Sequence, residues 1–195
     1  MPPTTAPAEL LAAAAPVIEK WSDGWYLFGA QAVILWGRPR LTADVDVTVR
    51  LRTSDPAGFC HEMEQAGFHV RVPDPEAFLA RTRVLPFLHL PTKLPLDVVV
   101  AGPGLEETFI QRAIQVHIEG LPVPVVSPED LIVMKILAGR PKDLDDVRSV
   151  LAERLDKLDL AHIRTLLSML EEALGRADLL PVIEAELIRS RENGV

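Results

Sequence analysis

Short apolar runs along the chain, bounded by turn-forming residues, predict the strands of a sheet. These runs are rich in Val, Leu, Ile and Phe, and glycine, proline or charged residues separate them. Such short blocks are typical of strands that pack at least one face into a core. They lie at residues 26–28, 44–49, 68–72, 84–90, 94–100, 115–120 and 123–126.

Longer stretches have apolar residues at a spacing of three or four and predict helices between and after the strands. Proline and acidic residues at their starts agree with helix N-termini, most clearly where Ser127 precedes Pro128. The predicted helices lie at residues 9–21, 30–35, 59–65 (with a start at 53–56), 74–79, 103–113, 131–138, 144–154, 160–174 and 178–191. The order of elements predicts an α+β fold, followed by a helical bundle.

Two aspartates, Asp44 and Asp46, carry the candidate chemistry of the strand at 44–49. Residues i and i+2 of a strand point to the same face, so we expect both carboxylates to project together while Val45 and Val47 pack on the other face. Carboxylate oxygens suit Mg²⁺, which proteins bind through one or two carboxylates and substrate phosphates. On its own, an Asp-x-Asp pair is more often a solvated strand face.

A glycine turn precedes the two aspartates. Gly29 follows the apolar run at 26–28 and precedes the helical pattern that starts at Ala30. A strand–glycine–helix junction presents free backbone N–H groups and a helix N-terminus to an anion. Between the turn and the aspartates, Arg40 is a candidate phosphate contact, whereas Arg38 is as readily explained as a solvated side chain. The pattern predicts a phosphate-binding turn beside a metal site.

A single acid, Asp97, interrupts the apolar strand at 94–100. It lies on the opposite face of that strand from Leu96 and Val98. A buried carboxylate without a partner is energetically costly, and its own segment offers it none. A metal shared with Asp44 and Asp46 would remove that cost. The alternative is a strand end that is exposed to water.

A second group of charged residues lies farther along the chain. Lys135 is on a helix otherwise made of apolar residues, where a lysine either extends to the surface or brings a positive charge to a phosphate. Arg140 follows the glycine that ends this helix, and a guanidinium there can bind phosphate oxygens in pairs. Asp143 is either the N-cap of the next helix or a partner of Asp146, three residues on. As a pair they would orient Lys135 and Arg140, or accept a proton from a hydroxyl.

Together these motifs resemble the nucleotidyltransferase superfamily with the DNA polymerase β-like fold. That family has a glycine turn between a strand and a helix, an Asp-x-Asp motif on the next strand, and a third carboxylate on a later strand. The matching residues in this chain are Gly29 and Ala30, Asp44 and Asp46, and Asp97. The resemblance covers about residues 20–150.

Within that superfamily, two segments are similar to the branch of the abortive-infection, AbiE-type (AbiEii) toxin nucleotidyltransferases and their uncharacterised relatives. One is R-L-T-A-D-V-D-V, which ends in the Asp-x-Asp strand. The other has the pattern K-x-x-A-x-R-x-x-D-x-x-D. Its four charged positions correspond to Lys135, Arg140, Asp143 and Asp146.

The resemblance implies a nucleotidyltransferase-like mixed β-sheet flanked by helices in a catalytic domain of residues 1–126. Residues 127–195 are then a C-terminal helical bundle packed on that domain. The implied activity is Mg²⁺-dependent transfer of a nucleoside monophosphate from a nucleoside triphosphate to a hydroxyl of an RNA, such as a tRNA-like molecule, or of a protein. The branch also implies a role in a toxin–antitoxin pair, with an antitoxin as protein partner.

The resemblance also implies roles for individual residues. Asp44, Asp46 and Asp97 would hold two Mg²⁺ ions. The implied catalytic residues are Asp44, Asp46, Asp97, Lys135 and Asp143. The implied substrate-binding residues are Gly29, Ala30, Arg40, Lys135 and Arg140.

One position departs from the family pattern. The second residue of the glycine motif is usually Gly or Ser, and here it is Ala30. Without a serine hydroxyl, triphosphate binding has to rely on backbone amides. This departure motivates an alternative, a catalytically weak or inactive nucleotide-binding module that acts through a protein partner. For the toxin–antitoxin role, residues 141–195 would be the partner surface.

Composition narrows the function classes. The net charge of −8 argues against a general nucleic-acid coat protein, whose surface would be basic, although a local basic patch can still hold RNA. The single cysteine, Cys60, excludes an intramolecular disulfide and suits a reducing cytoplasm. No apolar run approaches the roughly 20 residues that span a bilayer. We therefore expect a cytoplasmic protein without a membrane partner.

Overall fold

The computed structural model describes residues 5–42, 44–52 and 55–193. Two residues of the predicted helix start at 53–56, Thr53 and Ser54, lie outside this part of the chain. The chain forms two compact units. Unit 1 comprises Met1–Gln31 and Thr42–Val126, and unit 2 comprises Ala32–Leu41 and Ser127–Val195.

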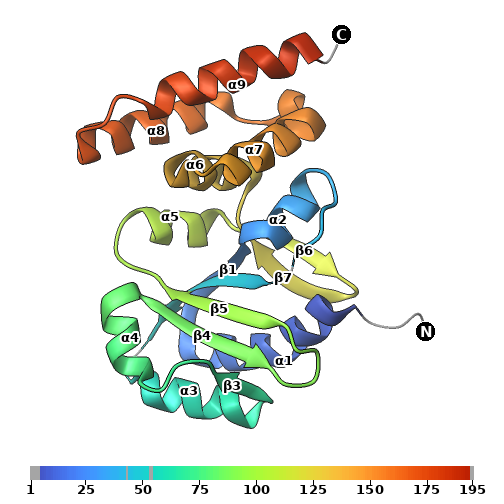
Figure 1. Ribbon diagram of the computed structural model, residues 1–195, viewed down its shortest axis with the longest axis vertical. Coiled ribbons are helices and arrows are strands. Elements are labelled where there is room, and N and C mark those ends of the chain that lie inside the picture. The colour runs from blue at the N-terminus through green and yellow to red at the C-terminus, as the bar shows by residue number, and fades with distance from the viewer. Residues whose placement is uncertain (1–4, 43, 53–54, 194–195) are drawn as a thin grey trace. The chain divides into compact units, whose positions relative to one another are not determined.

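Unit 1 contains a mixed seven-stranded sheet of order β3-β4-β5-β2-β1-β7-β6 (Figure 1). The strands are β1 (Ser22–Phe28), β2 (Val45–Leu51), β3 (Phe68–Val70), β4 (Val84–His89), β5 (Pro95–Val100), β6 (Ile114–Ile118) and β7 (Leu121–Val125). The pairs β2/β5 and β1/β7 are parallel, and the other four pairs are antiparallel. The predicted mixed sheet and the predicted hairpin at 115–126 are confirmed.

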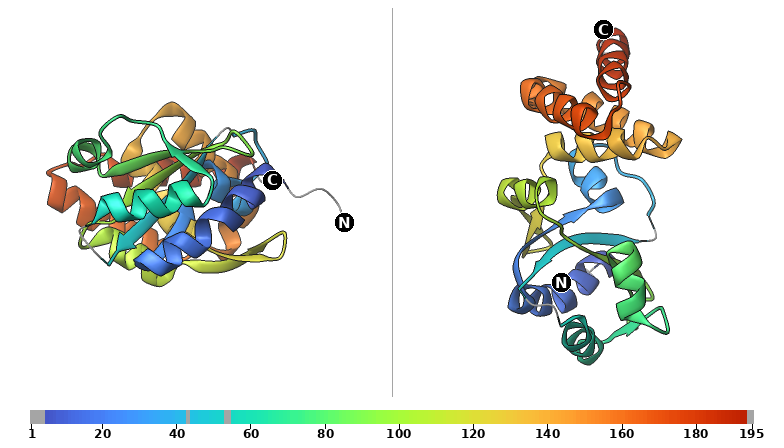
Figure 2. Two further views of the ribbon diagram at one scale, coloured as in Figure 1. Left: turned by 90° about the horizontal axis from the view of Figure 1, so that it is seen from below. Right: turned by 90° about the vertical axis from the view of Figure 1, so that its left-hand side faces the viewer.

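Helices cover both faces of this sheet (Figure 2). The helices of unit 1 are α1 (Ala6–Trp21), α3 (Pro56–Gln65), α4 (Pro75–Thr82) and α5 (Leu105–Arg112), and α2 (Gly29–Trp36) begins there. On the face covered by α1 and α3, the Phe59 ring lies 6.1 Å from that of Phe87 on β4. On the opposite face, Phe109 of α5 contacts Tyr26 of β1 at a ring distance of 6.4 Å. The alternating apolar residues of the strands therefore supply two separate core layers.

Unit 2 is helical, and its helices pack on one another. They are α6 (Pro128–Ala138), α7 (Pro141–Arg154), the 3₁₀ turn η1 (Leu155–Lys157), α8 (Leu160–Leu174) and α9 (Leu179–Asn193). The predicted ends of α6 are confirmed. Ser127 Oγ accepts a hydrogen bond from Asp130 N at 3.1 Å, and Gly139 ends the helix with a φ of +64°. The apolar stripe of α8 is buried at Ile163, Leu166 and Leu167.

Local sequence signals were wrong at three places. The first helix ends at Trp21 as expected, but the first strand, predicted to begin at residue 26, begins at Ser22, which pairs with Leu51 of β2. Asp44, expected inside β2, precedes the strand. Asp143 is not the N-cap of α7, because Arg140 holds that position and Asp143 lies in the first turn.

The described part of the chain contains no helix that is both long enough and apolar enough to cross a membrane.

Candidate functional site

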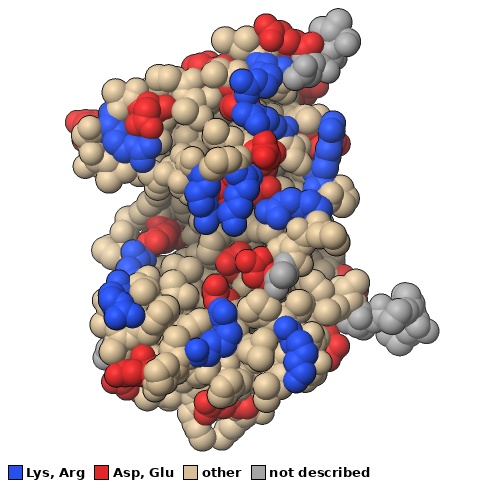
Figure 3. All heavy atoms as spheres, viewed as in Figure 1, with Lys and Arg blue, Asp and Glu red and all other residues tan. Residues whose placement is uncertain are grey.

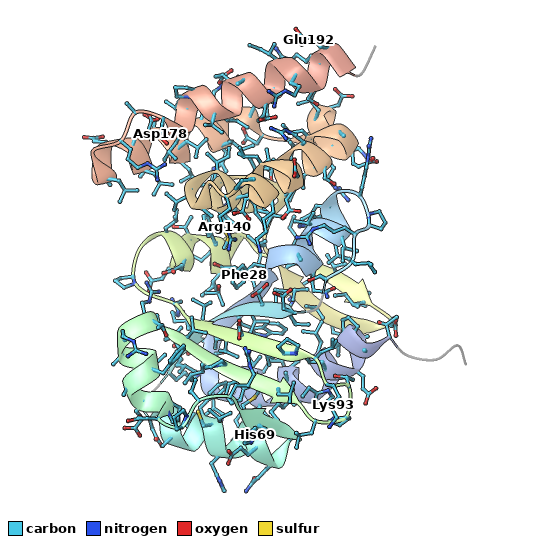
Figure 4. All side chains as sticks on the ribbon, in the orientation of Figure 1. Phe28, His69, Lys93, Arg140, Asp178 and Glu192 are labelled. Carbon is cyan, nitrogen blue, oxygen red and sulfur yellow. The ribbon has the colours of Figure 1, made fainter. Side chains whose placement is uncertain are left out.

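Asp46 lies in a row of residues that crosses the sheet of unit 1. Its partner in register on β1 is Phe28, labelled in Figure 4, and its partner on the parallel strand β5 is Asp97. Adjacent strands are about 4.8 Å apart, so the two carboxylates are neighbours on one face of the sheet. Figure 3 shows atoms of acidic residues next to one another on the face of unit 1 that is turned to the viewer, with atoms of basic residues beside them. The structure therefore brings together the second and third predicted carboxylates.

Asp44 is the exposed member of the predicted acidic set. It precedes β2, and its Oδ1 accepts a hydrogen bond from Thr42 Oγ1 at 2.6 Å. Its backbone oxygen lies 3.4 Å from Gln31 Nε2, on the helix that follows the glycine turn. These contacts hold the segment before β2 next to α2.

Gly29 places the backbone of the glycine turn against Asp46. Its φ is +64°, in the left-handed region that a side chain disfavours. A Cβ at this position would overlap with Asp46 Oδ2 and would lie 2.9 Å from Asp46 Cγ. The neighbouring Ala30 is buried. Glycine is therefore required here both by the turn and by the carboxylate that lies against it.

Asp97 has a partner that its own segment did not reveal. Arg71, which follows β3, forms an ion pair with its carboxylate, and each of the two side chains is 37% exposed. Burial raises the pKa of Asp97 above its usual range, the Arg71 guanidinium opposes that rise, and the charge of Asp44 adds to it. The shift indicates that Asp97 bears its negative charge at an energetic cost, which a nearby cation would reduce.

The donor chemistry of this cluster fits a hard divalent cation. Two carboxylates in register on parallel strands, with Asp44 two residues before Asp46, supply only oxygen ligands, which Mg²⁺ prefers. Among the described residues, no group of three or more His, Cys, Asp or Glu side chains is already arranged around a metal position. In this structure the Asp97 carboxylate is paired with the Arg71 guanidinium.

The second predicted group forms a charged network inside unit 2. Lys135 is buried on α6, and its Nζ donates to Asp143 Oδ1 at 3.1 Å and to Asp146 Oδ2 at 2.8 Å, both on α7. The lysine therefore does not extend to the surface. Its ammonium is enclosed by two buried carboxylates and ties α6 to α7.

Two arginines complete this network. Arg140, labelled in Figure 4, donates to both carboxylate oxygens of Asp143 at 2.5 and 3.0 Å. Arg40 does the same to Asp146 at 2.8 and 3.1 Å. Burial by itself raises the pKa of Asp143, but the hydrogen bonds from Arg140 and Lys135 outweigh it and leave that pKa below its usual range. Three cations thus share two carboxylates.

The geometry agrees with some of the roles expected for these residues and differs from others. The expectation that Asp143 orients Lys135 and Arg140 agrees with the observed bonds. Asp146 orients Lys135 together with Arg40 rather than with Arg140. The expected contacts of Lys135, Arg40 and Arg140 with phosphate stay predictions.

Arg71 is the residue that sequence reasoning missed. The predicted strand at 68–72 contained it, but β3 ends at Val70, and only the position of Arg71 beside Asp97 gives it a role. The one available signal was the lone acid in the strand at 95–100, which requires a partner. The partner's identity depends on strand order, because β3 and β5 are separated by β4 in the sheet.

A family model described as "Nucleotidyltransferase of unknown function (DUF6036)" matches residues 17–177. No curated protein matches the chain. The matched segment contains the acidic cluster of unit 1, which consists of Asp44, Asp46 and Asp97. It also contains the charged network of unit 2 around Lys135.

Solved structures agree with the fold. The solution structure of the antibiotic-resistance factor ANT(2'')-Ia is 19% identical, with 87% of this chain and 95% of that chain covered and a TM-score of 0.52. The crystal structure of ANT(2'')-Ia with adenylyl-2''-tobramycin is 19% identical, covering 80% and 94%, with a TM-score of 0.50. An antigenic nucleotidyltransferase-like protein from Paracoccidioides brasiliensis is 16% identical, covering 95% and 94%, with a TM-score of 0.54. These likenesses confirm the nucleotidyltransferase-like fold.

Proposed function

The chain belongs to the family of nucleotidyltransferases of unknown function (DUF6036), and from this membership we propose a Mg²⁺-dependent transfer of a nucleoside monophosphate from a nucleoside triphosphate to a hydroxyl group. Asp44, Asp46 and Asp97 are the proposed metal ligands. The observation that carries the proposal is the register of Asp46 with Asp97 on parallel strands, with the Gly29 turn directly against Asp46.

In the proposed reaction, the acceptor oxygen forms a bond to the α-phosphorus while the bond to the bridging oxygen of pyrophosphate breaks. Mg²⁺ held by the three aspartates would polarise the phosphate and make the acceptor hydroxyl more acidic. Asp97, next to the acceptor hydroxyl, accepts its proton. Backbone N–H groups at the start of α2 bind phosphate oxygens.

We propose an RNA or protein hydroxyl as the acceptor. ANT(2'')-Ia was solved with adenylyl-2''-tobramycin, so the test also includes a small-molecule acceptor. A toxin–antitoxin role belongs to the same proposal, and it predicts that expression of the active chain slows growth unless a partner protein is present. The buried, free thiol of Cys60 supports a cytoplasmic location.

The deciding experiment is a transfer assay with Mg²⁺ and each α-labelled nucleoside triphosphate, offered with cellular RNA, cellular protein or an aminoglycoside. Asp46→Asn is the test variant. Asp23→Asn is its control, because Asp23 is an aspartate of unit 1 that pairs with Arg52, is exposed and lies outside the acidic cluster. We expect wild type and the control to move label into one acceptor class and the test variant to move none. Equal transfer by Asp46→Asn would reject the proposal.

The second candidate is a nucleotide-binding module without transfer. Two observations favour it: Ala30 replaces the usual Gly or Ser, and the side chain of Lys135 is enclosed by Asp143 and Asp146 instead of being held ready for a phosphate. This candidate predicts that a nucleoside triphosphate raises the melting temperature of the wild-type chain without release of pyrophosphate. Pyrophosphate release that depends on Asp46 would exclude it.

A further inference from the structure

Unit 1 has a pocket of about 390 Å³ beside Asp97. This volume is within the range of small-ligand sites in proteins. The pocket is lined by Arg71, Val72, Phe78, Val84, Pro86 and Asp97. It is therefore an apolar pocket with one guanidinium and one carboxylate at its wall.

The position of the pocket follows from the sheet register. Asp97 pairs with Asp46 on one side and with Pro86 on the other, and Arg71 N donates to the Pro86 carbonyl at 2.9 Å. The pocket therefore adjoins Asp97 on the side away from Asp46. Because the Gly29 turn lies against Asp46, the phosphate-binding end and the pocket are on opposite sides of Asp97.

The walls of the pocket suit a flat apolar group. Phe78 contributes its ring from α4, a helix in which none of the eight described residues is buried. Val84 and Pro86 line the pocket from β4. The guanidinium of Arg81 lies over the Phe78 ring at 5.6 Å and adds positive charge next to the pocket.

Arg71 gives the pocket its charge preference. In the structure its guanidinium is paired with Asp97. If the Asp97 carboxylate binds a cation instead, the Arg71 guanidinium loses that partner. It is then left next to the apolar side chains of Val72, Val84 and Pro86. A guanidinium in such surroundings is stabilised by a new anion, which it can bind through two parallel hydrogen bonds. A polycationic acceptor would be repelled by the same group.

We propose that this pocket is the acceptor subsite and that it takes an acceptor with a planar apolar ring and one anionic group. The ring lies against Phe78 and Pro86, the anion binds Arg71, and the hydroxyl faces Asp97. Arg71 thereby moves from Asp97 to the acceptor. This inference rests on the proposed nucleotidyl transfer, whose acceptor it specifies. A terminal nucleotide of an RNA and a free aromatic acid share this chemistry.

The test measures binding without turnover, by NMR titration of the whole chain with 4-hydroxybenzoate and its uncharged analogue 4-hydroxybenzamide. In excess Mg²⁺ we expect the acid to bind about tenfold more tightly than the amide, as for a hydrogen bond to a charged group. Arg71→Gln should remove this preference. Arg52→Gln should retain it, because Arg52 also pairs with an aspartate of unit 1 but does not line the pocket. Equal binding of acid and amide by wild type, or an unchanged preference in Arg71→Gln, would overturn the proposal.

Two further measurements test whether the probe binds in this pocket and which class of natural acceptor it represents. Val84→Trp should fill the pocket and prevent binding of both probes. If its melting curve shows that it is unfolded, Phe78→Ala replaces it and should weaken both. Displacement of 4-hydroxybenzoate by the dinucleotide ApA would favour an RNA end as the source, and no displacement would favour a free aromatic acid. Because binding is measured without turnover, absence of transfer would reject the proposed function separately from the pocket.

Discussion

The backbone of Gly29 lies so close to Asp46 that an added Cβ would overlap with the Asp46 carboxylate. A left-handed glycine at the end of β1 lets the chain turn into α2 without a side chain in the space that Asp46 occupies. The position of the carboxylate and the conformation of the turn therefore depend on each other. A substitution at Gly29 is expected to affect both stability and chemistry.

We predict that Gly29→Ala destabilises the chain by at least the left-handed backbone penalty of about 1–2 kcal/mol and also displaces Asp46. A displacement of this kind would reduce transfer by about a hundredfold. Gly175→Ala is the control, because Gly175 has a φ of +62° and nothing within 4 Å of an added Cβ. Urea denaturation and the transfer assay should show both losses in Gly29→Ala and only the stability loss in Gly175→Ala. Equal activity of the two variants would contradict the displacement.

Cys60 is a second residue whose surroundings determine its chemistry. Burial is the main cause that raises the pKa of its thiol to about 11, and the charges of Glu64 and Glu76 add to it. We predict that a thiol reagent modifies Cys60 slowly at mildly alkaline pH in the folded chain and rapidly in denaturant, because the thiolate is the reactive species. Mass spectrometry of the alkylated protein measures both rates. Rapid modification of the folded chain would show that the thiol is accessible and ionised.

Ion pairs between elements define how the helices of unit 2 join. Glu186 of α9 is buried and accepts hydrogen bonds from Arg148 of α7 at 2.8 Å and from Arg189 of its own helix at 2.7 Å. Glu184, also on α9, accepts from Arg164 of α8, but that pair is exposed. Buried and exposed ion pairs on the same helix differ in solvent screening, so their contributions to stability should differ as well.

We predict that Glu186→Gln lowers the free energy of unfolding by about 1–3 kcal/mol at neutral pH. Hydrogen bonds from Arg148 hold the pKa of Glu186 below its ordinary value of 4.5. The stabilisation by the Glu186 carboxylate is therefore complete above pH 4.5 and is lost as the pH falls through the lowered pKa. The variant should therefore differ least from wild type in acid. Urea denaturation across the acid range measures this difference.

Glu184→Gln is the matched control for the α7–α9 joint. The pKa of Glu184 is also lowered, mainly by its hydrogen bonds with Arg164, but the pair is solvent-exposed. Exposed pairs contribute about 0–1 kcal/mol. A loss in Glu184→Gln equal to that in Glu186→Gln would show that burial does not decide the strength of these pairs.

At the scale of the whole molecule, unit 2 is assembled from two separate stretches of the chain, Ala32–Leu41 and Ser127–Val195. Arg154 donates to the carbonyl oxygens of Leu35 and Trp36, and its guanidinium lies 4.7 Å from the centre of the Trp36 ring. Arg38 N donates to Ser149 Oγ at 2.7 Å. The short stretch is therefore bound to α7 by several independent contacts.

We predict that a chain ending at Val126 melts at a lower temperature than the full chain, because the stretch 32–41 loses its contacts with α7. Each kcal/mol lost lowers the melting temperature by about 2–4 °C for a chain of this size. Co-expression of residues 127–195 as a separate chain should recover part of the difference. Thermal unfolding followed by circular dichroism measures this effect. An unchanged melting temperature of the fragment would show that these contacts do not stabilise the chain.

Much of the secondary structure and the identity of the acidic cluster followed from the sequence. The reason is that apolar periodicity, helix caps such as Ser127 and the glycine at 139 act within a few residues of their own position. Asp44, Asp46 and Asp97 were identifiable because charge in an apolar strand is costly and requires an explanation. The division of the chain at 126/127 and the roles of the three aspartates stay predictions.

Only the tertiary structure decided which distant residues become partners. Strand pairing extended the first strand back to Ser22 from its predicted start at residue 26. Strand order placed Arg71 beside Asp97, and packing of α6 on α7 enclosed Lys135 between two carboxylates. Such contacts join residues far apart in sequence, and local propensity carries no information about them. The sequence by itself therefore determined which residues carry the charge, and the fold decided which of them neutralise one another.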